Sequence, residues 1–360
     1  MKLLLATGLT LVASAKPPDA GAFATARPGY AFAFPRDHGS HPTFRTEWWY
    51  FTGHLRAGEG RRRYGYQLTF FRHASPPSAW KGSAAWRSDQ LLLAHAALTD
   101  ESGQRFLVEE RLARTGLLAD ASAAGLQIFL QNWRATQDAT GTIRLHLTVR
   151  GAALDLTLRP TTPPVIFGED GVSRKGADPT AASHYITFPR LLGQGTLRLP
   201  EGPAQAVQAT GWMDHEFSSN QLDPQQVGWD WAGLQLQDGR SLMVYRLRRE
   251  DGSQDPYSTL TEVDAAGRIR RSTRTFQFQG AGTWRSPTRG TTYPQPMVLQ
   301  AWGERFTLMP VLPNQELQTG RSTGITYWEG ACRVLDAEGR EVGEAYLELT
   351  GYAHSLKGRF

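Results

Sequence analysis

The sequence predicts an all-β protein made of two related β-domains, and three observations support this. The 37 Gly and 21 Pro among its 360 residues favour many turns over long helices. No segment of twelve or more residues has a convincing helical period. Short β-branched or aromatic segments bounded by Gly, Asp or Pro recur along the chain, and one pair of them resembles a second pair later in the sequence.

The chain opens with features typical of a signal peptide. Lys2 supplies a short positive region, an apolar run from Leu3 to Val12 follows, and the Ala-Ser-Ala run at 13–15 has the form of a cleavage site. The apolar run is too short to span a membrane as a stable helix. We therefore expect residues 1–15 to be removed near Ala15 and the mature protein to be exported, with the periplasm as the expected compartment.

Turn and strand signals follow in order. Residues 16–29, which are rich in Pro and Gly, predict a flexible leader. Alternation of apolar and polar residues is almost unbroken over 142–150, as in a half-buried strand. The expected strands include 48–55, 64–72, 90–98 and 144–149, and the expected hairpin turns are 237–240, 264–267 and 336–339.

An internal echo divides the chain. In the segments 49–55 and 229–235 a Trp precedes a Gly by four residues, and a strand carrying Tyr66 or Tyr245 follows. The echo predicts two β-domains, at 30–190 and 191–360, joined near the Pro- and Gly-rich stretch 189–203. Closed antiparallel barrels would leave neither domain with an exposed edge, and small barrels can enclose apolar cavities.

Composition excludes several classes of protein. The net charge is +5 and the pI about 9.4, but no Lys/Arg block is long enough for a nucleic-acid interface, so we expect no nucleic-acid partner. The sole cysteine, Cys332, cannot form an internal disulfide. No Gly-rich phosphate loop or dinucleotide fingerprint occurs, and we expect no cofactor.

The strongest candidate site is the Gly-Trp-Met-Asp-His-Glu run at 211–216. Asp214, His215 and Glu216 are adjacent ionisable residues beside Trp212, and aromatic neighbours exclude water and let pKa values move. A buried His can exchange protons near neutral pH, and a carboxylate can orient its ring. The alternative is structural: Asp214 closes a turn and His215 is a hydrogen-bonded core residue.

Other aromatic and acidic residues could line a ligand cavity. On a strand, Glu47, Trp49 and Phe51 face one side and Trp48 and Tyr50 face the other. Glu47 is then either a second acid or the ion-pair partner of Arg45 or Arg72. The candidate ligand-binding residues are Glu47, Trp49, Tyr66, Trp212, Trp229, Trp231 and Glu329. For Trp229 and Trp231 the alternative is a core aromatic pair, and we expect one of them in a core and the other in the cavity lining; for Glu329 the alternative is a structural role.

Two further patterns are set aside. His38 and His41 with Asp37 have spacing that could bind a metal, but no third ligand is marked, and a loop packed over a barrel mouth is preferred; no metal site is expected. Ser218 and Ser219 follow His215 closely without a nucleophile elbow, so a serine hydrolase triad is not expected.

Several runs resemble the signatures of one family. They are Phe-Pro-Arg-Asp-His-Gly at 34–39, Thr-Glu-Trp-Trp-Tyr-Phe-Thr-Gly at 46–53, Trp-Met-Asp-His-Glu-Phe-Ser-Ser at 212–219, Gly-Trp-Asp-Trp at 228–231, Tyr-Trp-Glu-Gly at 327–330 and Glu-Leu-Thr-Gly-Tyr at 348–352. Over about residues 30–355 the chain resembles the AttH/CrtC-like family of lipocalin-like secreted proteins. The resemblance implies two tandem lipocalin-like (calycin) antiparallel β-barrels.

The resemblance also suggests chemistry. Carotenoid 1,2-hydratases of this superfamily add water across an isoprenoid double bond, using a His followed two residues on by a Trp and a Tyr followed two residues on by an Asp. His215 and Tyr245 match, but Phe217 and Leu247 replace the Trp and the Asp. This departure argues against carotenoid hydration itself, and it leaves Asp214 or Glu216 as the acid.

The resulting hypothesis is an exported two-barrel protein whose cavity or inter-barrel cleft holds an apolar isoprenoid or acyl molecule. In the enzyme version, a hydratase or hydrolase-like lyase, Asp214 or Glu216 is the acid, His215 a proton relay and Tyr245 a hydrogen-bond donor. The alternatives are a periplasmic lipid carrier, in which the same residues anchor a head group, and an accessory partner of a membrane export system.

Overall fold

The structure is a computed structural model that describes residues 23–58, 60, 62–75, 90–220 and 222–358. The predicted signal peptide and the first part of the predicted leader lie outside the described residues. Within them the one helical element is a short 3-10 helix, η1 (Arg36–His38), so the expected all-β class is confirmed. No helix in these ranges has the length and apolar content needed to cross a membrane.

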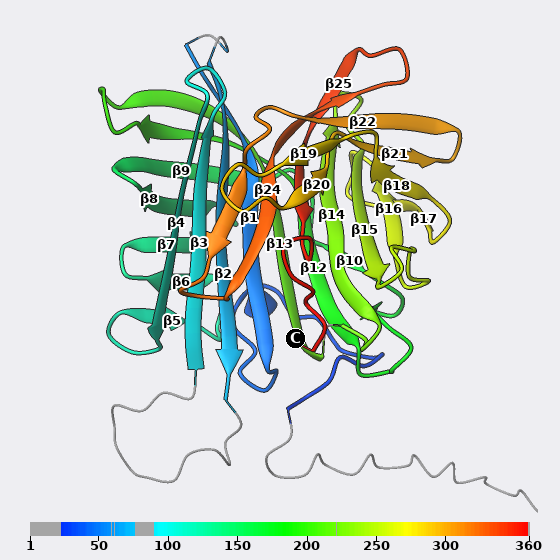
Figure 1. The fold of residues 1–360 in the computed structure, drawn as a ribbon. Coiled ribbons are helices and arrows are strands. Elements are labelled where there is room, and N and C mark those ends of the chain that lie inside the picture. Colours follow the sequence, from blue (N-terminus) through cyan, green and yellow to red (C-terminus); the bar gives the residue numbers. More distant parts are fainter. Residues whose placement is uncertain (1–22, 59, 61, 76–89, 221, 359–360) are drawn as a thin grey trace, which may run out of the picture.

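Thirteen strands form the first antiparallel sheet (Figure 1). Its main path runs β4-β3-β2-β1-β13-β12-β9-β8-β7-β6-β5, and β10 and β11 pair with β12. The strands are β1 (Thr46–Ala57), β2 (Arg62–Ala74), β3 (Gln90–Asp100), β4 (Arg105–Arg114), β5 (Ala119–Ala121), β6 (Gln127–Leu130), β7 (Trp133–Gln137), β8 (Ile143–Val149), β9 (Ala152–Pro160), β10 (Val165–Phe167), β11 (Ser173–Arg174), β12 (Ala182–Arg198) and β13 (Gln205–Asn220).

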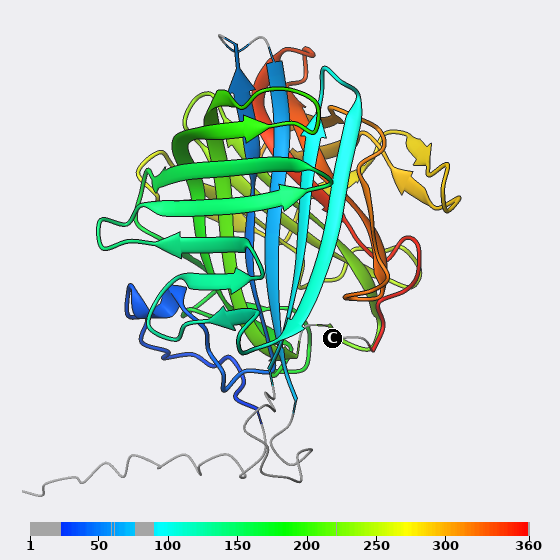
Figure 2. The same cartoon turned by 90° about the vertical axis from the view of Figure 1, so that its left-hand side faces the viewer.

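This sheet curls into a nearly closed barrel. Figure 2 shows the short strands β5–β9 crossing the long strands β1–β4, and β3 and β4 contact β6 and β8 across the interior. Alternate residues of these strands fill that interior with a packed core, in which Trp49, Tyr66, Phe70 and Trp133 are fully buried. The first barrel is therefore filled by its own side chains.

Ten strands form the second antiparallel sheet, in the order β17-β16-β15-β14-β25-β24-β22-β21-β18, with β23 paired to β24. The strands are β14 (Gln226–Leu236), β15 (Ser241–Arg249), β16 (Thr259–Val263), β17 (Ile269–Thr273), β18 (Gln277–Gly280), β21 (Met297–Ala301), β22 (Glu304–Pro310), β23 (Glu316–Thr319), β24 (Ile325–Leu335) and β25 (Glu341–Leu349); β19 (Thr283–Arg285) and β20 (Thr292–Pro294) form a separate two-stranded sheet. A second packed core, including Trp328 and Phe278, fills its inner face.

The predicted strands and hairpin turns are confirmed. Each of the expected turns at 237–240, 264–267 and 336–339 joins two neighbouring antiparallel strands. Gly239 has φ +92° in the first of these turns, a left-handed conformation that glycine adopts without a Cβ clash. The two Trp-marked segments are β1 and β14, and each begins a hairpin within its own sheet.

The division between the two units differs from the predicted one. The junction expected at 190/191 falls inside β12, which pairs with both β9 and β13. The change of sheet comes instead between β13 and β14, after Asn220. Gly193 and Gly195 belong to the stretch 189–203 that predicts the junction, but in the structure they lie within β12. They allow close approach of its neighbour, since a Cβ at Gly193 would overlap the carbonyl oxygen of Thr157 on β9.

The described end of the predicted leader is packed on the first barrel. Ala26 is 3% exposed and contacts Val172 and Ala182. The Ala24 amide donates to the Thr43 carbonyl over 2.9 Å. Residues 23–29 therefore belong to the fold, because their backbone and one apolar side chain have fixed partners.

Candidate functional site

A cavity of about 340 Å³ lies between the two sheets, outside both packed cores. The first sheet contributes β1, β2, β3, β12 and β13 to its wall, and the second contributes β14, β15, β24 and β25. Apolar and aromatic side chains dominate this wall, among them Trp48, Tyr50, Phe71, Leu91, Leu93, Tyr185, Trp229, Trp231, Tyr245, Ile325 and Tyr327. The cavity is an inter-barrel cleft, one of the two locations expected from the sequence.

Strand alternation splits the Asp-His-Glu run between two faces. Across the β1–β13 ladder, Asp214 lies opposite Tyr50 and Glu216 opposite Trp48, and all four line the cavity. His215 lies opposite Trp49 and faces the first barrel, where its ring stacks on that Trp with centroids 4.8 Å apart. The three residues therefore do not form one proton-transfer cluster, because successive side chains of a strand point to opposite faces.

Asp214 is a buried carboxylate with three donors. Oδ2 accepts from the Tyr185 hydroxyl at 2.7 Å, and Oδ1 accepts from the Thr187 hydroxyl at 2.6 Å and Trp212 Nε1 at 2.8 Å. Burial raises the pKa of Asp214 to about 7, although the three hydrogen bonds favour its charged form. Trp212 therefore acts as a hydrogen-bond donor that fixes the Asp214 carboxylate, and it does not itself line the cavity.

Glu216 is held by a buried lysine. Lys175 Nζ lies 2.9 Å from Glu216 Oε1, and the Ser183 hydroxyl donates to the same oxygen. The ammonium also lies 4.2 Å from the ring centroid of Tyr245 and 4.9 Å from that of Tyr185. Glu216 is thus an ion-pair partner, and of the two acids proposed from the sequence Asp214 is the one without a fixed cation.

The second sheet supplies a further pair of acids to the cavity wall. Glu329 and Glu348 lie directly opposite each other on β24 and β25. Burial and the neighbouring carboxylates raise the pKa of Glu348 to about 7 and that of Glu329 well above its usual range. Trp229 Nε1 donates to Glu348 over 3.0 Å, and Gln67 of the first sheet donates to Glu329 over 2.6 Å.

Glu348 was not among the candidate residues. In the sequence, the run 348–352 that contains it carries a family resemblance and no separate indication of a site. Trp231 lies opposite both Tyr245 and Glu348 in the β14 ladders, so the register places these residues on one face. His95 of β3 was also missed: it is buried in the wall, and its Nδ1 lies 2.7 Å from the Tyr327 hydroxyl.

The structure separates the candidate residues into two groups. The cavity is lined by Glu47, Asp214, Glu216, Trp229, Trp231, Tyr245 and Glu329, whereas Trp49, Tyr66, Trp212 and His215 lie outside its lining. Trp49 and Tyr66 pack in the first core, whereas Trp229 and Trp231, of which one is expected in a core, both line the cavity. Glu47 borders the cavity, but its carboxylate is bound to Arg72 at 2.8 Å, as one of the two alternatives expected.

The arrangement is suited to proton transfer in an apolar setting. Asp214 and Glu348 come from opposite walls, and the pKa of each is raised to about 7. A carboxyl group with a pKa near the working pH can both give and take a proton efficiently. Faces of the surrounding Trp and Tyr rings attract cationic groups, as they attract Lys175 here.

Comparison with known proteins places the fold. The family model described as AttH-like matches residues 25–352. The chain is similar to a protein assigned as AttH from Nitrosomonas europaea, with 34% identity, a TM-score of 0.83, and coverage of 92% of this chain and 99% of that one. It also shares its fold with kievitone hydratase from Nectria haematococca, with 14% identity, a TM-score of 0.67, and coverage of 94% and 98%. No match was found among curated proteins.

These similarities confirm the lipocalin-like, two-unit all-β fold implied by the sequence motifs. The family match spans both sheets and every strand that lines the cavity. The chain belongs to the AttH-like family.

Proposed function

We propose that the cavity between the two sheets binds an apolar isoprenoid or acyl molecule and catalyses the addition or removal of water by acid–base chemistry. The observation that carries the proposal is the pair Asp214 and Glu348, two carboxyl groups in a cavity whose surface is mainly apolar, with pKa values raised to about 7. Kievitone hydratase shares the fold, but at 14% identity it supports the architecture alone.

The surroundings of the two acids assign their roles. Asp214 accepts three hydrogen bonds from donors, an arrangement that favours the carboxylate, so Asp214 acts as the base or stabilises a developing cation. At Glu348, burial and neighbouring carboxylates favour the protonated acid, and the one hydrogen bond from Trp229 Nε1, which favours the charged form, only partly offsets them. Hydration then follows when Glu348 protonates a double bond and Asp214 takes a proton from the attacking water.

Glu216 and Tyr245 act beside this pair. The Lys175–Glu216 ion pair fixes the wall next to Asp214, and Tyr245 presents its ring to the Lys175 ammonium. His215 and Glu47 stabilise the first barrel and do not exchange protons with the ligand, because His215 faces away from the cavity and the Glu47 carboxylate is bound to Arg72. With the signal peptide predicted at residues 1–15, we propose that this chemistry takes place outside the cytoplasm.

The test starts from the protein purified from its native compartment and incubated in ¹⁸O-labelled water, with organic extracts analysed by mass spectrometry. Wild type is expected to carry an isoprenoid or acyl species and to convert part of it to a product that differs by one labelled water. Asp214→Asn and Glu348→Gln should retain the ligand without the labelled product. Glu341→Gln, on the same strand but in a surface pair with Arg63, is the matched control and should behave as wild type.

A cavity-filling variant tests the location separately. Leu93 lies in the cavity wall on β3, and Leu93→Trp should exclude the ligand while the protein stays folded. Unchanged ligand content in this variant would place the ligand elsewhere. A defined ligand without labelled product in wild type would reject the enzyme and support the lipid-carrier function, for which the apolar wall alone suffices.

A further inference from the structure

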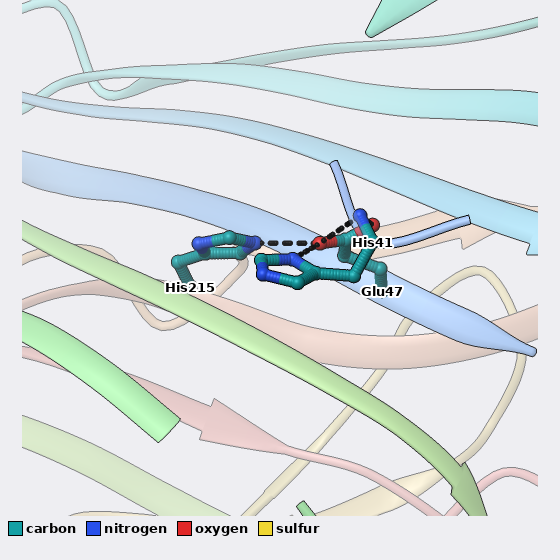
Figure 3. Close-up of side chains that lie close together, drawn as sticks. All are labelled: His41, Glu47 and His215. Atoms are coloured by element: carbon teal, nitrogen blue, oxygen red, sulfur yellow. Dashed lines mark hydrogen bonds and ion pairs between the residues drawn. The ribbon is translucent and has the colours of Figure 1, made fainter. Parts of the chain in front are cut away.

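A second cluster of ionisable side chains lies outside the cavity chemistry, where the N-terminal segment covers the first barrel. His41 follows η1, Glu47 is the second residue of β1 and His215 lies on β13 (Figure 3). All three are buried, with exposed fractions of 7%, 0% and 0%. One nitrogen or oxygen atom of each lies within 4.8 Å of the others, so the three side chains point at one place.

The distances suit a small cation. His41 Nδ1 and His215 Nε2 lie 2.7 and 2.8 Å from the same oxygen of Glu47. In a tetrahedral zinc site neighbouring ligand atoms are about 3.3 Å apart, so the groups need to separate by about half an ångström. Both rings are already oriented by stacking, His41 on Phe217 at 3.6 Å and His215 on Trp49 at 4.8 Å between centroids.

An outer layer of hydrogen bonds orients these groups. His41 Nε2 lies 3.2 Å from Asp37 Oδ1, so a carboxylate binds the ring nitrogen that faces away from Glu47, as is usual behind metal-bound histidines. Asp37 is fixed in turn by the Ala33 amide at 2.7 Å. The second oxygen of Glu47 accepts from Arg72 Nε at 2.8 Å and from the His41 amide at 2.9 Å, while the first oxygen faces both imidazoles and lies 3.1 Å from the same amide.

Charge decides which chemistry is possible. Arg72 already balances Glu47, so a cation bound by two neutral imidazoles adds positive charge, and the Asp37 carboxylate 3.2 Å from His41 Nε2 offsets part of it. Each imidazole has a nitrogen within hydrogen-bonding distance of the same Glu47 oxygen, and metal binding at that nitrogen requires the tautomer with the hydrogen on the other ring nitrogen.

We propose that His41, Glu47 and His215 bind one zinc ion, which fastens the segment before β1 to β1 and β13. Two imidazoles and a carboxylate are a ligand set that zinc uses in proteins, and borderline nitrogen donors favour it over calcium or magnesium. The site is structural: His41 and His215 lie outside the cavity lining, and only Glu47 borders the cavity. Of the Asp37–His38–His41 pattern only His41 is a ligand, and the other two ligands, Glu47 and His215, lie on strands β1 and β13.

The test uses the mature protein, stripped with a chelator and dialysed against buffered zinc, with bound metal measured by mass spectrometry and thermal unfolding recorded in parallel. Wild type should bind one zinc per chain and unfold at a higher temperature with zinc than without. His41→Gln and His215→Gln should lose both effects. His146→Gln, whose ring pairs with Asp155 at the surface over 2.6 Å, is the matched control and should retain them.

Asp37→Asn provides a milder variant, because it leaves the three ligands in place. It should weaken zinc binding by about tenfold or more, as loss of a carboxylate behind a bound histidine does. Wild-type protein that takes up no stoichiometric zinc at micromolar free metal would overturn the proposal, as would full zinc binding by both histidine variants. Metal content is read independently of turnover, so this result and that of the ¹⁸O experiment can fail separately.

Discussion

Replacing Glu47 by Gln tests the buried network beneath the N-terminal segment. Glu47 is fully buried and binds Arg72 at 2.8 Å, His41 Nδ1 at 2.7 Å and His215 Nε2 at 2.8 Å. The substitution keeps the shape but removes the carboxylate that, among the residues the structure describes, is the only one paired with Arg72, itself 2% exposed. Breaking a buried ion pair by removing one partner costs about 3–5 kcal/mol, because an uncompensated charge remains.

The expected result is therefore a loss of about 3–5 kcal/mol in the free energy of unfolding, measured by urea denaturation in the presence of a chelator so that no metal contributes. The matched control is Glu338→Gln, whose side chain is 65% exposed and pairs with Arg340 at 2.9 Å at the surface. That variant should lose less than about 1 kcal/mol. Equal losses in the two variants would refute the claim that Glu47 compensates a buried charge.

Two further predictions follow from the same structure. Gly53→Ala should destabilise the protein by about 2 kcal/mol or more in urea denaturation, because a Cβ at Gly53 would overlap the carbonyl oxygen of Thr210. Gly320→Ala is the control and should be nearly neutral, because a Cβ there meets nothing within 4 Å. Similar losses in the two variants would show that β1 and β13 do not approach each other closely at Gly53. Burial raises the pKa of Glu348 to about 7, so the folded chain keeps a proton that the unfolded chain loses between about pH 4.5 and 7, and stability from this group falls as pH rises through that window. In Glu348→Gln the decline in unfolding free energy between about pH 5 and 8 should be smaller than in wild type, and an unchanged slope would argue that Glu348 is charged throughout.

The fold could be predicted well from local signals. Alternation and turn residues depend on neighbours in sequence, so the strands and hairpins were expected at the right places. The junction was wrong because Gly193 and Gly195 were interpreted as linker residues, whereas they allow the close pairing of β12 with β9. Sequence alone does not distinguish a glycine that forms a linker from one that permits close strand approach.

The site could be predicted only in part. The Asp-His-Glu run lies on a strand of the cavity wall, but successive side chains of that strand face opposite sides, so His215 points away from Asp214. The similarity between β1 and β14 predicts correctly that each strand begins a hairpin. It does not predict which side chains face the cavity, since Trp49 packs in a core and Trp229 lines the cavity. Glu348 was missed because its neighbours Glu329 and Trp231 come from other strands, and only the register brings the three together.

The position of the cavity has a consequence for how ligand specificity can diverge in this architecture. In a single lipocalin-type barrel, the number and tilt of the strands determine the diameter of the interior. Here each half of the chain contributes one wall, and Asp214 and Glu348 belong to different halves. The distance between these two acids depends on the relative position of the two halves. A small displacement of one half against the other would therefore change the length of the molecule that the cavity can admit, while both hydrophobic cores stay intact. By the same reasoning, a chain severed between β13 and β14 yields two halves, neither of which contains a complete site.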